Sequence, residues 1–165
     1  MERLKTIRPR NYLFEVLVFL NGIVLIGIWW LILRDVRKAI LAGCISYLVL
    51  AWCLRLLFQR HHMLGIKHLR TKNYAEAAAC FARSYEFFSN HPGIDRFRFI
   101  TMFASSAIPY QHMALNNLGI CYLYLGQDQQ ALDAFRKLAA LNANYPNIDA
   151  AIDAIQRHMQ ETEEN

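Results

Sequence analysis

The stretch Leu13–Leu33, LFEVLVFLNGIVLIGIWWLIL, decides the fold of this chain, and a second apolar stretch, Ala39–Phe58, follows five residues later. The two stretches contain 21 and 20 residues. The hydrocarbon core of a bilayer is about 30 Å thick, and about 20 helical residues cross it. The short connection predicts that both stretches form one antiparallel transmembrane hairpin.

A cleaved signal peptide is the alternative interpretation of the N-terminal part of the chain. The basic residues that precede the first stretch would suit a signal peptide. The apolar region is too long for one, however, and Ile28–Leu31 (IWWL) ends it without a small-residue cleavage site. We therefore expect a retained anchor. The basic residues of this N-terminal segment, residues 1–12, are Arg3, Lys5, Arg8 and Arg10.

Basic residues also predict the orientation of the hairpin. Nine Lys and Arg residues lie before the first stretch or beside and after the second, whereas three lie in the connecting loop. Cytoplasmic segments carry the excess of Lys and Arg. We expect an integral membrane protein, of the bacterial inner membrane, with both termini and the C-terminal domain in the cytoplasm. The residues beside and after the second stretch are Arg55, Arg60, Lys67, Arg70 and Lys72.

The net charge of +5 does not indicate a nucleic-acid-binding protein, because residues 60–165 contain ten basic and ten acidic residues. The excess charge lies beside the apolar stretches, where it favours an anionic membrane surface. Two polar residues within the stretches need partners. We expect Asn21 to bond to the neighbouring helix and Arg55 to extend its head group outward.

Residues after Leu64 follow helical periodicity, and three prolines divide them into segments. We expect an all-α domain, with Asp128 and Asn147 as helix N-caps and Gly126 as a helix end. No proline interrupts Ala39–Arg70, so the second span is expected to continue directly into the first helix of this domain. The predicted helices are two within Gly65–Ser89 with a break near Lys72, then Asp95–Ser106, Tyr110–Leu125, Asp128–Leu141 and Asp149–Gln160.

One pattern in the C-terminal domain is specific. A small residue is followed by an aromatic residue, a turn glycine, an alanine and a second aromatic residue, with spacings that let two helices approach closely. These residues are Leu118-Gly119, Tyr122, Gly126, Ala131 and Phe135. The pattern resembles the tetratricopeptide repeat, a helix–turn–helix unit.

A weaker copy of this pattern lies 54 residues upstream, with His68 in place of the first aromatic residue and Lys72 in place of the turn glycine. The resemblance implies a repeat at residues 59–89, an insert at 90–109, a repeat at 110–145 and a capping helix at 147–160, together a domain of residues 59–165. The residues of the upstream copy are Leu64-Gly65, Tyr74, Ala77 and Phe81.

Repeats of this family bind peptides in a groove lined by the first helix of each pair. The carboxylate clamp of some family members is absent, although Asn117 matches its central asparagine. Asn117, Ile120 and Tyr124 are the leading contact candidates. Mapped by the family's spacing, the groove residues are His62, Ile66, Leu69, Met113, Asn116, Asn117, Ile120, Leu123 and Tyr124.

The insert has three interpretations. It could form a helix packed on the repeats, a membrane-surface contact with basic residues at lipid head groups, or a partner site. It also resembles inserts of uncharacterised bacterial two-span repeat proteins, which implies no activity. The residues of the surface and partner interpretations are Arg96, Phe97, Arg98 and Phe99.

The chain lacks the motifs of catalysis and of metal or cofactor binding, and Cys44, Cys53, Cys80 and Cys121 form no CxxC pair. We expect no enzyme, no cofactor and no metal, and we expect the cysteines to be buried thiols. The predicted function is a membrane-anchored scaffold that recruits protein or peptide partners through the groove, and that could form homo-oligomers. The alternative is a structural subunit of a larger membrane complex, held mainly through the hairpin.

Overall fold

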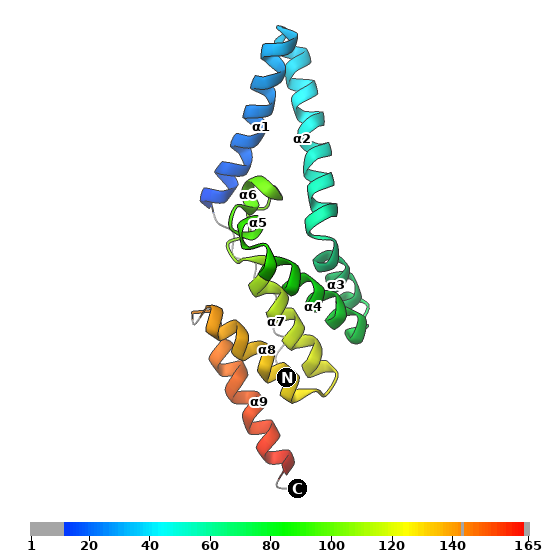
Figure 1. The fold of residues 1–165 in the computed structure, drawn as a ribbon, viewed down its shortest axis with the longest axis vertical. Helices are drawn as coiled ribbons and strands as arrows, with labels where there is room; N and C mark the ends of the chain where they lie inside the picture. The colour runs from blue at the N-terminus through cyan, green and yellow to red at the C-terminus, as the bar shows by residue number, and fades with distance from the viewer. Residues whose placement is uncertain (1–11, 143, 164–165) are drawn as a thin grey trace. The chain divides into compact units, whose positions relative to one another are not determined.

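The computed structural model describes residues 12–142 and 144–163, which form helices and no β-strand (Figure 1). The predicted all-α fold is confirmed. The basic residues predicted to orient the hairpin at its N-terminal side lie outside the described residues. The described chain divides into two compact units. The first contains the residues up to Arg60 together with Pro92–Pro109, and the second contains His61–His91 and the residues from Tyr110 onward.

The hairpin of the first unit consists of α1 (Tyr12–Leu33) and α2 (Val36–Phe58). The turn between them is defined by two residues. Arg34 adopts a left-handed conformation (φ 54°), which ends α1. The carboxylate of Asp35 then accepts hydrogen bonds from the backbone N–H groups of Arg37 and Lys38, so it caps the start of α2.

Small residues let α1 and α2 pack closely. A Cβ atom at Gly43 would lie 2.6 Å from the side chain of Ile26, so this contact requires glycine. The indole N–H of Trp29 donates to the hydroxyl of Ser46 at 2.9 Å. Most other side chains of both helices face outward, and both helices are long and apolar enough to cross a membrane.

The second unit contains α3 (Arg60–Arg70), α4 (Tyr74–Asn90), α7 (Tyr110–Tyr124), α8 (Asp128–Leu141) and α9 (Ile148–Glu163). These helices match the predicted segments. Two details differ from the prediction. The N-cap of α8 is Gln127 rather than Asp128, which is the first residue of the helix. In addition, α3 does not continue α2.

The chain breaks between α2 and α3 at Gln59, whose backbone (φ −102°, ψ 4°) lies outside the helical region. The prediction that the second span runs directly into the next helix is therefore wrong. The break separates two helices of different character. α2 is apolar on all sides, whereas α3 buries one face through His62 and Gly65.

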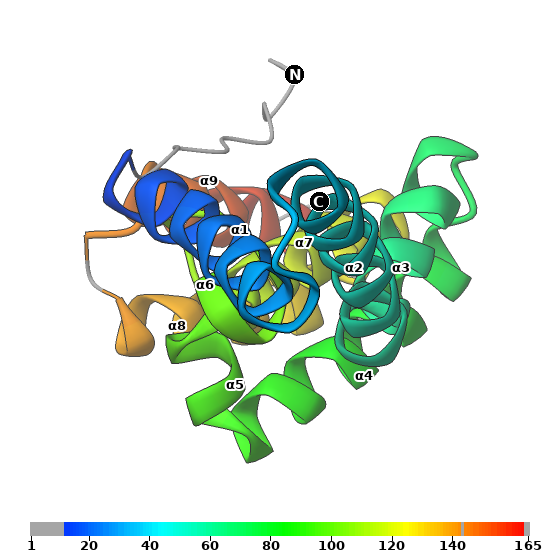
Figure 2. The same ribbon diagram turned by 90° about the horizontal axis from the view of Figure 1, so that it is seen from above.

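The insert forms two short helices, α5 (Pro92–Arg96) and α6 (Arg98–Thr101), followed by irregular backbone. The prediction of one helix at Asp95–Ser106 is wrong, because the left-handed conformation of Phe103 (φ 48°) prevents helical continuation. The insert belongs to the first unit, together with the hairpin. α6 lies between the separated ends of α1 and α2 (Figure 1) and beside α1 when seen from above (Figure 2).

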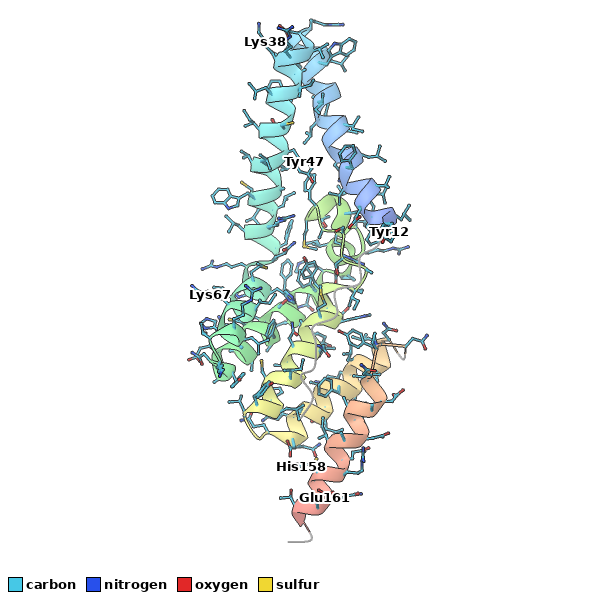
Figure 3. All side chains as sticks on the ribbon, turned by 180° about the vertical axis from the view of Figure 1, so that it is seen from behind. Tyr12, Lys38, Tyr47, Lys67, His158 and Glu161 are labelled. Atoms are coloured by element: carbon cyan, nitrogen blue, oxygen red, sulfur yellow. The ribbon has the colours of Figure 1, made fainter. Side chains whose placement is uncertain are left out.

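Two apolar clusters hold the second unit together. The first joins α3, α4, α7 and α8 around Phe81, and the second joins α7, α8 and α9 around Phe135. Ile148 and Ile155 bury the inner face of α9, while its outer face is polar, so α9 closes the array as a cap. His158 on α9, labelled in Figure 3, also bonds to the carboxylate of Asp128 at 2.8 Å.

Candidate functional site

The pairs α3–α4 and α7–α8 share one packing device. A Cβ atom at Gly119 would lie 2.7 Å from the ring of Phe135, and one at Gly65 would lie 2.8 Å from the ring of Phe81. In each pair the aromatic ring therefore lies directly on the glycine of the preceding helix. Both rings are fully buried, and glycine is the residue that leaves room for them.

The turns inside the two pairs are also equivalent. Gly126 has a φ of 69° and Lys72 a φ of 58°. In the second pair the N–H of Gln127 donates to the carbonyl of Tyr122 at 2.9 Å, and in the first the N–H of Asn73 donates to the carbonyl of His68 at the same distance. Two pairs that agree in helix contact and in turn geometry are copies of one structural unit.

The family comparison identifies this unit. Residues 112–145 match the family model of the tetratricopeptide repeat. This segment is a tetratricopeptide repeat. The matched residues cover α7 from its third residue, the Gly126 turn and all of α8, so the resemblance seen in the sequence is confirmed. The comparisons with curated proteins and with solved structures gave no match.

Tetratricopeptide repeats are typically non-catalytic modules that bind proteins, so the repeat indicates protein–protein interaction. Within the described residues, no three His, Cys, Asp or Glu side chains lie together in a way that could hold a metal ion. The chemistry that this unit offers is packing and hydrogen bonding with a protein surface.

Two of the predicted groove residues lie in the interior. His62 is 3% exposed, and its ring contacts the rings of Phe81 and Tyr110 and the hydroxyl of Ser84. Asn117 is 4% exposed, because α7 packs between α4 and α8. Neither side chain lines an open surface, so their expected position in the groove is wrong.

Four more predicted residues contribute to the apolar clusters. Ile66 and Leu69 of α3 pack against the cluster around Phe81, and Ile120 and Leu123 of α7 pack against the cluster around Phe135. All four remain partly exposed. They can therefore form the apolar floor of a binding surface, but they also stabilise the fold.

The three remaining predicted residues, Met113, Asn116 and Tyr124, form a strip on α7 together with Ile120. We call these four residues the α7 strip. Their spacing of three or four residues places them on one face of α7. Tyr124 is the most accessible of them, with 56% of its surface exposed. Met113, Asn116 and Ile120 are partly exposed.

One neighbour of this strip could not be predicted from the sequence. The ring of Tyr124 stacks on the ring of Tyr74 from α4, with centroids 4.5 Å apart and an interplanar angle of 8°. The two tyrosines occupy different positions of the repeat pattern, so repeat spacing does not pair them. Antiparallel packing of α4 on α7 brings them together. Tyr124 is exposed and Tyr74 half-buried, and tyrosines at the surface are enriched at protein interfaces.

The four insert residues divide between surface and interior. Arg96 and Phe97 are exposed, whereas Phe99 is half-buried against the ring of Phe14. Arg98 is 5% exposed and donates to the carbonyls of Asp95, Ser106 and Ala107. The expectation that Arg98 lies at lipid head groups is therefore wrong, since its guanidinium is used within the chain.

The four thiols are unpaired, and they occupy different environments. Cys44 and Cys53 are exposed on α2, Cys80 is half-buried, and Cys121 is buried. The expectation of buried thiols is thus correct for Cys121 and wrong for Cys44 and Cys53. Burial raises the pKa of the Cys121 thiol to about 12 and also raises the pKa of Tyr145.

Proposed function

We propose that this protein is a membrane-anchored scaffold that recruits a protein partner to the cytoplasmic side of a membrane through the α7 strip and Tyr74. The observation that carries the proposal is the presence, in one chain, of a tetratricopeptide repeat and of two apolar helices whose side chains mostly face outward. The repeat supports protein binding, and the hairpin supports membrane attachment.

The proposed contact surface combines an aromatic anchor with polar groups. Tyr124 and Tyr74 offer a flat apolar area with two hydroxyl groups, and Asn116 offers an amide that can donate and accept hydrogen bonds. An extended or helical peptide could place an apolar side chain on the tyrosine stack and bond its backbone to Asn116. This combination favours a protein segment over a small charged ligand.

The alternative is a structural subunit of a membrane complex that is bound mainly through the hairpin. Asn21 is a polar group of the hairpin that we expected to bond to the neighbouring helix. Its amide instead donates to the carbonyl of Phe99 at 2.8 Å, in the insert of the same chain. The remaining hairpin surface is apolar and would suit lipid as well as protein, so it does not favour a complex. The tetratricopeptide repeat favours the recruiting scaffold.

Site-directed photo-crosslinking in the native membrane tests the proposal. A photoreactive phenylalanine derivative replaces Tyr124 in one variant and Arg136 in the control, because Arg136 is exposed on α8 away from the α7 strip. We expect an adduct with a defined protein at position 124 and none at position 136. Adducts obtained only from probes in α1 or α2, such as at Leu48, would favour the complex subunit.

Charge substitution gives the matching loss-of-function test. Tyr124→Glu should reduce partner capture at least tenfold, because it places a carboxylate in the tyrosine stack. Arg136→Glu changes the charge of the same repeat outside the strip and should leave capture unchanged. Circular dichroism checks that both variants keep their helices, and equal capture by both would contradict the proposed surface.

A further inference from the structure

The insert is tied to both helices of the hairpin by polar contacts, of which the one to α1 lies well inside the helix. The amide of Asn21 on α1 donates to the carbonyl of Phe99 at 2.8 Å, and the guanidinium of Arg55 on α2 donates to the carbonyl of Phe103 at 3.4 Å. Asn21 lies nine residues after the start of α1, which corresponds to about 13 Å of helix rise. The insert therefore reaches into the space between the hairpin helices, past the first two turns of α1.

Aromatic contacts reinforce this position. The ring of Phe103 meets the ring of Tyr47 edge to face, with centroids 4.9 Å apart, and Tyr47 points into the space between the two helices (Figure 3). Tyr47 lies eleven residues before the end of α2, which corresponds to about 16 Å of helix. The left-handed backbone of Phe103 is a conformation that bulky residues adopt only when their surroundings enforce it.

The insert also satisfies its own backbone. Arg98 bonds to the carbonyls of Asp95, Ser106 and Ala107 at 2.8–3.0 Å, so it joins the entering and returning parts of the segment. The hydroxyl of Thr101 donates to the carbonyl of Ile94 at 2.7 Å. Irregular backbone is tolerated at membrane depth only where such internal bonds replace water.

We infer that residues 92–109 form a re-entrant segment that enters the bilayer between α1 and α2, turns near half its depth and presents Phe97 and Ile100 to lipid acyl chains. The inference rests on the proposed membrane location of the hairpin. Phe97 and Ile100 are 50% and 52% exposed, and Ile100 directly follows the carbonyl that Asn21 binds. Lipid is the partner that suits them, because the exposed surface of α1 and α2 around them is apolar as well.

Arg96 fits the shallow end of this segment. Its guanidinium lies 5.8 Å from the centre of the Phe97 ring, while Arg96 itself is exposed. A basic side chain beside an aromatic ring is typical of the boundary between acyl chains and head groups. Phe97 therefore marks the interface and Ile100 the deeper position.

Fluorescence quenching in lipid nanodiscs tests the inference with the full-length chain. Cys44, Cys53 and Cys80 are replaced by alanine, and Cys121 stays because it is buried. A bimane label is then placed at Ile100→Cys, at Lys137→Cys on exposed α8, or at a restored Cys44 on α2. Lipids with brominated acyl chains quench a label inside the bilayer, and aqueous iodide quenches a label in water.

We expect the label at position 100 to behave like that at Cys44, with strong quenching by brominated lipid and several-fold weaker iodide quenching than at position 137. Iodide quenching at position 100 as strong as at position 137, with Cys44 still quenched by lipid, would overturn the re-entrant segment alone. Absence of lipid quenching at Cys44 would overturn the membrane location of the hairpin and the segment together.

A second variant tests what holds the segment in place. Asn21→Leu removes the donor to the Phe99 carbonyl and keeps α1 apolar, so iodide quenching at position 100 should rise several-fold. Ile23→Leu on the exposed side of α1 is the matched control and should change nothing. Equal iodide quenching at position 100 in both variants would overturn the role of Asn21.

Discussion

The two helical pairs of the second unit, α3–α4 and α7–α8, share a fold but differ in how well their sequences suit it. Both place an aromatic ring on a glycine and both turn through a left-handed residue. The second pair uses glycine at that turn, whereas the first uses Lys72. Only residues 112–145, which contain most of the second pair, match the family model. Helix packing therefore preserves the repeat geometry after part of its sequence pattern is lost.

Removing the aromatic ring from each pair should have the largest effect. Phe135→Ala and Phe81→Ala should each lower the free energy of unfolding by about 3–5 kcal/mol, because both rings are fully buried and leave a cavity. Urea titration of the full chain in detergent micelles, followed by circular dichroism, measures the loss. A much smaller loss for Phe81→Ala would show that the first pair lacks the core that the contacts indicate.

The glycines beneath these rings give an intermediate effect. Alanine is the better helix former by about 0.5–1 kcal/mol, but its Cβ atom would lie under 3.0 Å from the ring in both pairs. We expect Gly119→Ala and Gly65→Ala to destabilise by about 1–3 kcal/mol through overpacking. Gly93→Ala is the control, since no atom lies within 4 Å of its added Cβ. Stabilisation by Gly65→Ala would contradict a tight α3–α4 contact.

The turns should respond with opposite signs. Lys72→Gly should stabilise the protein by about 1 kcal/mol and Gly126→Ala should destabilise it by a similar amount, because a Cβ atom is strained at positive φ. Lys72→Ala removes the charge but keeps the Cβ atom, so it should give no gain. The same urea titration compares the three variants, and a gain from Lys72→Ala would indicate that charge rather than backbone strain matters.

The smallest expected difference between the two pairs lies in the reactivity of their cysteines. Cys80 on α4 is half-buried, whereas Cys121 on α7 is buried with a pKa of about 12. In the folded state the pKa of Cys121 exceeds its ordinary value of 9.0, so the folded protein holds this proton more tightly than the unfolded chain does. The free energy of unfolding therefore contains a contribution from Cys121 that is lost as the pH rises from about 9 towards 12. Between pH 7 and 9, maleimide should modify Cys80 and leave Cys121 intact until urea unfolds the repeats. Rapid native labelling at Cys121 would show that the second pair opens readily.

Sequence periodicity was sufficient to predict the helical pairs and the two apolar helices. Each of those features is local, since it depends on residues within about two helical turns or on a fixed repeat spacing. The pattern around Gly119 and Phe135 located the repeat that the family comparison then identified. The break at Gln59 was missed because neither proline nor glycine marks it.

The position of the insert could not be predicted in this way. Asn21 and Phe99, which bond to each other, are 78 residues apart, and Arg55 and Phe103 are 48 apart. A polar residue in an apolar stretch signals that a partner exists but not which one. The burial of Asn117 was missed for a related reason, because it depends on which helices flank α7 rather than on the place of Asn117 in the repeat.

The division of the chain between its two units has a mechanical consequence. The backbone passes from one unit to the other at Arg60–His61, at His91–Pro92 and at Pro109–Tyr110. A force on the repeats is therefore carried by one covalent connection to α2 and by two connections to the insert, which hydrogen bonds from Asn21 and Arg55 hold to the hairpin. After a single proteolytic cut near Gln59, the repeats would stay bound to the hairpin only through the insert and these non-covalent contacts.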